Sequence, residues 1–144
     1  LSPYLLRSTL VTHFTACFDV RRKDLDYDMI RRVLGQWHRY ANCYFGDYYP
    51  LTPYSLDASQ WIAWQFDLPE KGAGVVQAFR RDKSVYESAC FKLSGLDPAA
   101  RYSVTNLDSG KAKTYSGREL TEKGVTVSVT EQPGDTVLSY SKLK

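Results

Sequence analysis

The hydrophobic period of this sequence changes near Pro50, and the change limits the folds that are open to the chain. Before Pro50, apolar residues in the range 26–45 recur at spacings of three and four, which is typical of an amphipathic helix. After Pro50, apolar and polar residues alternate in short runs that Gly, Pro and Asp separate, which is typical of strands and turns. The sequence therefore predicts a helical first part and a β-rich second part.

The helix that we predict over about residues 26–45 carries one apolar stripe. Acidic residues crowd its start, where carboxylates cap free amides and meet the positive end of the helix dipole. We expect Gly46 to end the helix in a left-handed conformation and Gly35 to allow close packing. The stripe consists of Ile30, Val33, Leu34, Trp37, Ala41 and Tyr44.

Upstream, residues 10–20 are β-branched and aromatic, and they lack a helical stripe. We predict a buried strand over about residues 14–18, and we expect residues 1–9 to include the end of a preceding helix. A strand, a short polar loop and a long helix make one βα unit, and continuous apolar strands are typical of parallel sheets covered on both faces. One such unit cannot bury both faces of its strand, so we expect it to be a remnant of a larger fold.

Alternating runs dominate residues 51–144, and the turn residues between them include Gly72, Gly95 and Gly110. Six or seven short strands at this spacing predict a mainly β fold, an antiparallel β-sandwich of Greek-key type. The runs centre on residues 62–66, 75–79, 88–93, 102–105, 125–129 and 137–140.

Composition excludes several classes of function. The formal net charge of +3 comes from 19 basic and 16 acidic residues, which is too balanced to favour nucleic acid or an acidic membrane as a partner. No apolar run is long enough to span a bilayer. The three cysteines are far apart, so we expect neither a disulfide framework nor a zinc site, and we expect no cofactor.

Aromatic residues make up 14% of the chain, which is typical of β-rich proteins and of proteins that bind sugars.

Several runs occur in the order found in one known family. One part of the chain resembles the end of the catalytic barrel of α-galactosidase-like glycoside hydrolases, family 36 and relatives. It consists of Cys17-Phe-Asp-Val-Arg-Arg, the predicted helix and then Phe45-Gly-Asp-Tyr-Tyr-Pro-Leu-Thr-Pro-Tyr-Ser. The later runs resemble the C-terminal β-sandwich that follows that barrel, and they are Trp61-Ile-Ala-Trp-Gln-Phe-Asp, Val76-Gln-Ala-Phe-Arg-Arg81, Leu93-Ser-Gly-Leu-Asp-Pro-Ala-Ala-Arg-Tyr102, Asp108-Ser-Gly110 and Ser116-Gly-Arg-Glu-Leu120.

The resemblance implies a division of the chain into two parts. Residues 1–50 would be the end of a (β/α)8 barrel, with its last strand at about 14–18 and its last helix at about 26–45, and residues 51–144 would be the sandwich. The parent enzyme would hydrolyse a terminal galactoside with retention. In the family, both catalytic aspartates lie on earlier barrel strands, so no catalytic residue is carried over and we expect this chain alone to be inactive.

Asp19 is the single candidate for substrate binding. It follows the predicted barrel strand, and the carboxyl ends of barrel strands form the active-site face. It could accept a hydrogen bond from a sugar hydroxyl. The alternative is an ion pair with Arg21 or Arg22, or capping of the helix.

Two aromatic groups have alternative interpretations. Residues Tyr44, Phe45, Tyr48, Tyr49 and Tyr54 could form a sugar-stacking platform, but we favour packing between the helix and the sandwich. Trp61 and Trp64 lie three apart on a predicted strand, so they face opposite sides of the sheet, and at least one belongs to the core.

The partners that we expect follow from these interpretations. The sandwich would buttress the catalytic barrel of the same polypeptide, and the alternative function is that of a carbohydrate-binding module. Without barrel strands, the stripe of helix 26–45 needs the sandwich or a second copy of the chain as cover, so we predict a homo-oligomer built partly on that helix. Free thiols favour the cytoplasm.

Overall fold

The computed structural model describes residues 1–16 and 18–144. Eight strands in this part of the chain form two antiparallel sheets, which confirms the mainly β fold and the sandwich. The larger sheet has the strand order β1-β2-β3-β8-β5-β6, and the smaller one pairs β4 with β7. The strands are β1 (Asp47–Pro50), β2 (Ile62–Leu68), β3 (Ala73–Arg80), β4 (Ser88–Phe91), β5 (Arg101–Asn106), β6 (Ala112–Ser116), β7 (Val125–Ser128) and β8 (Gly134–Lys142).

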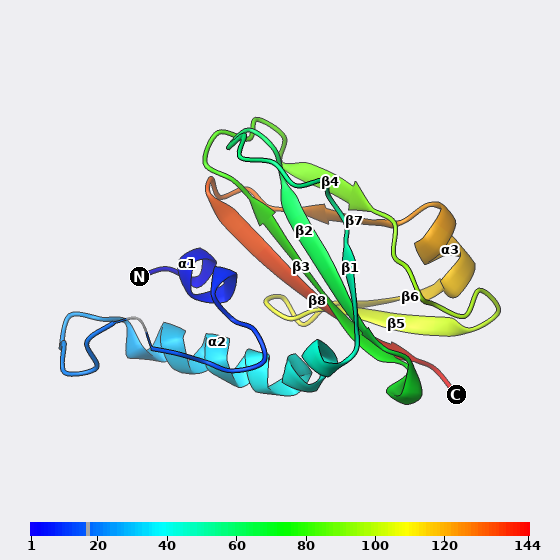
Figure 1. Ribbon diagram of the computed structural model, residues 1–144, viewed down its shortest axis with the longest axis horizontal. Coiled ribbons are helices and arrows are strands. Elements are labelled where there is room, and N and C mark those ends of the chain that lie inside the picture. Colours follow the sequence, from blue (N-terminus) through cyan, green and yellow to red (C-terminus); the bar gives the residue numbers. More distant parts are fainter. Residues whose placement is uncertain (17) are drawn as a thin grey trace.

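The helices cover both sides of the larger sheet. In Figure 1, α1 and α2 lie on one side of the sheet, while β4, β7 and α3 lie on the other. The chain crosses between the two sheets and returns, so that β8 is inserted between β3 and β5, as Greek-key connections require. The helical elements are α1 (Pro3–Ser8), α2 (Tyr27–Tyr40), η1 (Ala41–Phe45), η2 (Pro69–Lys71) and α3 (Gly117–Glu122).

The sandwich interior lies between the two sheets and is closed at one end by α3. Ser116 caps this helix: its hydroxyl accepts from the backbone N–H of Glu119, and the Glu119 carboxylate accepts from the backbone N–H of Ser116. Leu120 of α3 is fully buried in this interior. Its other buried apolar residues are Ala63, Val76, Ala78, Phe91, Leu93, Tyr102, Val104, Val125, Val127, Leu138 and Tyr140.

The predicted helix is present as α2 followed by the 3-10 turn η1, so helical structure runs over residues 27–45. The Asp26 carboxylate caps it by accepting from the backbone N–H of Met29 at 2.8 Å. Its apolar face is buried on the outer side of the larger sheet, in contact with residues of α1. This second core, the helix-side core, contains Leu6, Leu10, Met29, Ile30, Val33, Trp37, Tyr40, Cys43, Tyr44, Val75, Leu107 and Val137.

Burial of the α2 stripe changes the argument for an oligomer. Val33 is fully buried and Ile30 is 5% exposed, because the sheet and α1 cover them. The sandwich, and not a second copy of the chain, is therefore the cover for this helix. The homo-oligomer stays a prediction, but a second copy of the chain is no longer needed to cover the stripe.

The strand predicted at residues 14–18 is absent. Residues 14–16 and 18 form no strand, and Cys17 lies outside the described residues. No strand in the described chain runs beside this segment, so its backbone has no ladder to join. Two of the preceding carbonyls accept hydrogen bonds from side chains instead: that of Leu10 from the Tyr44 hydroxyl, and that of Val11 from the Trp37 indole.

Two glycines do not act as the sequence suggested. Gly46 is not left-handed, since its φ is −89°; a Cβ there would lie 1.9 Å from the Asp67 carbonyl oxygen, so the close approach to β2 requires glycine. Gly35 has no neighbour within 4 Å of its missing Cβ, so it allows no close packing.

Candidate functional site

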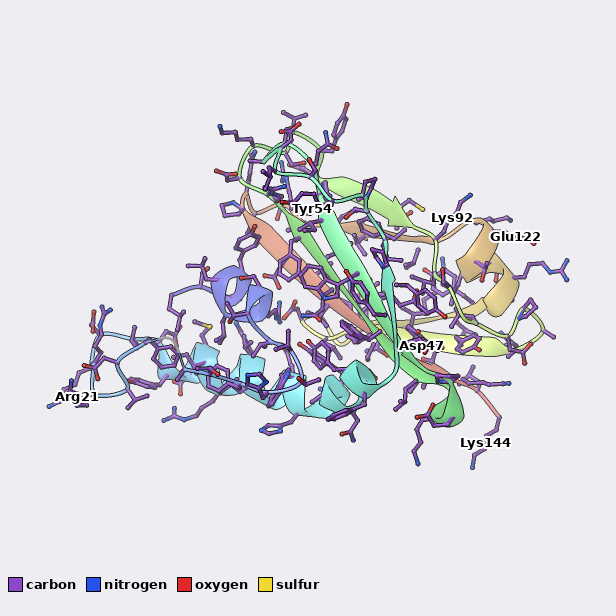
Figure 2. The ribbon with its side chains drawn as sticks, in the orientation of Figure 1. Arg21, Asp47, Tyr54, Lys92, Glu122 and Lys144 are labelled. Atoms are coloured by element: carbon purple, nitrogen blue, oxygen red, sulfur yellow. The ribbon has the colours of Figure 1, made fainter. Side chains whose placement is uncertain are left out.

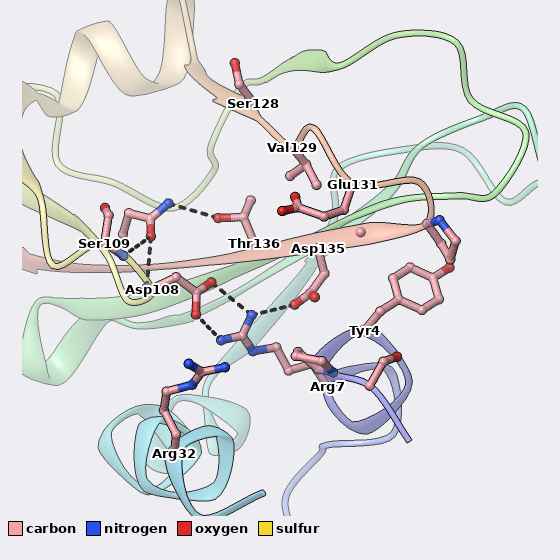
Figure 3. A pocket seen from close by; sticks show the side chains of 15 residues that line it. Tyr4, Arg7, Arg32, Asp108, Ser109, Ser128, Val129, Glu131, Asp135 and Thr136 are labelled. Carbon is pink, nitrogen blue, oxygen red and sulfur yellow. Dashed lines mark hydrogen bonds and ion pairs between the residues drawn. The ribbon is translucent and has the colours of Figure 1, made fainter. Parts of the chain in front are cut away.

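The junction between the helices and the larger sheet holds a network of charged and polar side chains around the buried Arg7, and we take it as the candidate site. A cavity of about 520 Å³ opens there, and residues from α1, α2, the turn after β5 and the start of β8 line it. Figure 3 shows Arg7 at its base, with Asp108 and Asp135 on either side. The sequence alone singled out neither Arg7 nor Asp135, and it named Asp108 only as part of a run of the resemblance.

Arg7 is 2% exposed, and each of the two terminal nitrogens of its guanidinium donates two hydrogen bonds. Nη1 donates to Asp135 at 2.8 Å and to Asp108 at 2.9 Å, and Nη2 donates to Asp108 and to the Gln36 side chain at 2.6 Å. A planar guanidinium suits such a fork. Because these partners lie on α2, β8 and the turn after β5, one side chain of α1 joins four parts of the fold.

Burial raises the pKa of each of the two carboxylates, Asp108 and Asp135, whereas pairing with Arg7 lowers it. Burial alone would raise the pKa of Asp108, but its hydrogen bonds and charge attraction to Arg7 hold that pKa below the ordinary value. Asp135 is more deeply buried, and this burial raises its pKa despite Arg7. Arg32, which reaches from α2 toward the same group in Figure 3, further favours the ionised form of Asp108.

A second polar contact joins the same layers at the centre of the sheet. The Gln77 side chain on β3 is fully buried, and its oxygen accepts from the Tyr44 hydroxyl at 2.7 Å and from the Trp64 indole at 3.0 Å. Burial raises the pKa of Tyr44, so its hydroxyl stays protonated and remains a donor. An amide within the apolar run of β3 was the signal in the sequence that could have revealed this contact.

The structure places Asp19 far from this junction. It lies in the exposed loop before α2, next to Arg21, which Figure 2 labels at one extremity of the molecule. Its carboxylate accepts from the Arg21 guanidinium and backbone N–H, both at 2.9 Å, and the bond from the Arg21 side chain lowers its pKa. In this chain Asp19 therefore makes the ion pair that was the alternative to sugar binding.

The aromatic residues of the predicted cluster separate into two groups. Tyr44 is buried, and its ring packs against Phe66 at 4.8 Å between centroids, as interlayer packing requires. Phe45, Tyr48 and Tyr54 are exposed. The two tryptophans face opposite sides as predicted: Trp61 packs against the sandwich interior, and Trp64 packs on the side of Gln77 and Phe79.

The junction has the chemistry of a structural joint. Its two carboxylates, the buried Asp135 and the partly exposed Asp108, are engaged by the same guanidinium, which leaves neither free to act as a nucleophile or a general acid. No group of three or more His, Cys, Asp or Glu among residues 1–16 and 18–144 is placed to hold a metal ion. In that same part of the chain, no helix has the length and apolar character that a membrane span needs.

Comparisons with known proteins point to one family. A family model described as "Glycosyl hydrolase family 36 C-terminal domain" matches residues 61–138, just over half of the chain. No curated protein sequence matches the chain. The alternative interpretation as a carbohydrate-binding module gains no support from these matches.

Solved α-galactosidase structures share the fold. The enzyme from Lactobacillus brevis matches with a TM-score of 0.69 at 16% identity, over 88% of this chain and 18% of that one. AgaA from Geobacillus stearothermophilus matches with a TM-score of 0.67 at 19% identity, over 85% of this chain and 17% of that one. AgaB from the same organism matches with a TM-score of 0.62 at 22% identity, over 84% of this chain and 16% of that one. The chain thus spans less than a fifth of the length of these enzymes.

Proposed function

Since the chain belongs to the glycosyl hydrolase family 36 C-terminal domain family, we propose that it is the C-terminal part of a retaining α-galactosidase. In this proposal, residues 51–144 form a sandwich that buttresses the catalytic barrel, and residues 1–50 are the end of that barrel. The substrate of the parent enzyme is a terminal galactoside. The chain itself is inactive.

The observation that carries the proposal is the attachment of α2 to the sheet through buried polar contacts. Arg7 and Gln77 join α1, α2 and η1 to β3 and β8, so a helix at the end of a barrel would be held in position by the sandwich. The coverage of the matches adds support. Residues 51–144 make up about two thirds of the chain, so matches over 84–88% of it include part of residues 1–50.

The contacts of the carboxylates support the expectation that this chain is inactive. Retaining hydrolysis needs two carboxyl groups about 5–5.5 Å apart that are free to react. Asp108 and Asp135 are committed to Arg7, and Asp19 to Arg21. The catalytic pair therefore belongs to the rest of the parent enzyme in this proposal. Free thiols at Cys43 and Cys90 suit a reducing compartment such as the cytoplasm, which is part of the proposal.

The buttress is tested in the parent enzyme with Arg7→Met, which removes the joint, and Arg21→Met, which removes only an exposed ion pair. We expect the temperature at which hydrolysis of p-nitrophenyl α-galactoside is lost to fall in the first variant and to stay unchanged in the second. Equal thermal inactivation of both variants and the parent would show that the sandwich does not brace the barrel. The anomer first released, observed by proton NMR, tests retention separately.

A further inference from the structure

We propose that a groove between two loops of the sandwich binds a neutral oligosaccharide. The groove, called here the loop groove, lies between residues 52–61 and residues 83–89 and has a volume of about 660 Å³. That volume is within the range of small-molecule sites, which is roughly 300–1,000 Å³. Tyr54, which takes part in it, lies at the end of the sheet opposite Lys144 (Figure 2).

The first wall of the loop groove is fixed by Arg81. Its guanidinium donates to the backbone carbonyls of Ser55 at 2.8 Å, Asp57 at 2.9 Å and Leu56 at 3.2 Å. The backbone N–H of Lys83 also donates to the carbonyl of Ala58, which ties the two loops together. The irregular segment after β1 therefore has a defined path although it has no regular structure of its own.

The second wall is held from below by the neighbouring arginine. Arg80 is 4% exposed, and its guanidinium donates to the carbonyls of Ser84, Val129 and Thr130. Ser84 is itself fully buried. The loop that carries Val85 and Tyr86 is thus anchored to β3 and to the segment after β7.

Trp61 forms a rigid aromatic surface between the two walls. Its indole N–H donates to the Tyr86 carbonyl at 3.0 Å, and its ring lies 6.2 Å from that of Phe91. The ring is therefore fixed by the second wall and by the sandwich interior. It remains partly exposed and lines the groove.

Large apolar side chains are held in water on these fixed walls. Tyr54 is 86% exposed and Tyr86 is 71% exposed, and Val85, which also lines the groove, is exposed as well. Exposed apolar groups gathered on a preorganised surface are characteristic of binding sites, because little ordering free energy is lost when a ligand arrives. The apolar faces of pyranose rings can stack on such aromatic rings, and this stacking would remove apolar area of both the sugar and the aromatic ring from water.

The polar groups in the groove favour a neutral, hydroxyl-rich ligand. Asp57 supplies an acceptor and Lys83 a donor, so their charges balance, and Gln60, Ser59 and Ser88 add groups that both donate and accept. A phosphate or an acidic sugar would need an excess of positive charge. The proposal goes beyond the function proposed above.

The test is a nitrogen-15 NMR titration of the full chain with raffinose, maltotriose and cellotriose up to about 20 mM. We expect at least one of the three to shift amides of residues 52–61 and 83–89 saturably, with a Kd on the order of 1 mM. Tyr54→Ala and Tyr86→Ala should each raise that Kd about threefold or more, which is the effect of losing one aromatic contact. Tyr48→Ala removes an exposed ring outside the groove and should leave the Kd unchanged.

Three results would overturn the proposal. The first is the absence of any saturable shift with all three sugars. The second is binding that Tyr48→Ala weakens as much as Tyr54→Ala does. The third is protection of Tyr54 and Tyr86 from hydroxyl-radical labelling in the sugar-free parent enzyme, since the groove would then be a contact between domains.

Discussion

The two faces of the larger sheet are packed by different means. The sandwich interior is filled almost entirely by apolar side chains, and its main buried polar chain runs from Gln65 through Tyr140 to Asp67. The helix-side core adds a charged network around Arg7 and an amide at Gln77 to its apolar residues. Apolar packing tolerates small shifts, whereas a buried ion pair requires defined geometry. The sandwich should therefore fold robustly, while the position of the helices depends on a few polar contacts.

Arg7→Met should separate the two faces most clearly. It leaves Asp135 buried without its partner, and such losses typically cost about 3–5 kcal/mol. We expect the amides of α2 to lose protection from hydrogen exchange, while those of β3 and β8 keep most of theirs. Uniform loss across helices and strands would mean that the two faces form one cooperative unit.

Leu93→Ala tests the other face. Leu93 is 1% exposed in the sandwich interior, and removal of a buried leucine costs roughly 3 kcal/mol. Because the helices rest on the sheet, both faces should lose stability together in urea unfolding. A variant that loosened only the sandwich and spared α2 would contradict this order of dependence.

Gln77→Leu should have a smaller effect at the joint. It removes the acceptor of the Trp64 indole, and the loss of a partner by a buried donor typically costs about 1–3 kcal/mol. The Tyr44 hydroxyl, whose single proton Gln77 and the Leu10 carbonyl share, keeps only the Leu10 carbonyl. Adding Tyr44→Phe should cost less in this background than in the unmodified chain, because the lost partner is already absent. Additive losses of unfolding free energy in the double-mutant cycle would refute the coupling.

The pH dependence should differ in sign between Asp108 on the helix side and Asp67 in the sandwich interior. The lowered pKa of Asp108 means that its stabilisation is present above its ordinary pKa of about 4 and is lost as pH falls through the folded value. Burial raises the pKa of Asp67, so its stabilisation is present below about 4 and is lost as pH rises through the folded value. Asp108→Asn should therefore flatten the acid limb of unfolding free energy against pH. Asp67→Asn should raise stability at neutral pH relative to acid, and the reverse pattern would contradict the assignment.

Asp19→Ala should have the smallest effect on this chain, since its ion pair with Arg21 is exposed. No change in its melting temperature is expected. In the parent enzyme, a fall in kcat/KM for α-galactosides would support substrate contact by Asp19. Unchanged kinetics there would remove Asp19 from the site.

The sequence predicted the interior of the fold better than its edges. Six predicted strand runs are present, and the two strands that were missed, β1 and β6, are the edges of the larger sheet. Edge strands are exposed on more sides, so they lack clean alternation; Ala112, Lys113 and Thr114 are all exposed. At residues 14–18 the sequence predicted a strand that the described residues do not form. Residues of strand-like composition form a strand only where a neighbouring strand can pair with them, and no strand of the described chain lies there.

The candidate site was beyond sequence reasoning for a different reason. Arg7 meets Asp108 and Asp135 across 101 and 128 residues, and no local spacing encodes such pairs. Helix α2 was predictable because its period and its Asp26 cap are local. The elements that cover the apolar stripe of α2 were not predictable, because they depend on which face of the larger sheet the other elements leave open.

The central strands β3 and β8 contribute to both hydrophobic cores, since Val75 and Val137 face the helix-side core and Val76 and Leu138 face the sandwich interior. A gene trimmed to residues 61–138, the span of the family match, would lack α1 and α2 and would end within β8. The apolar residues on the helix side of the sheet would then be exposed to water. A soluble expression product therefore needs the segment from Pro3 onward as well as the sandwich strands.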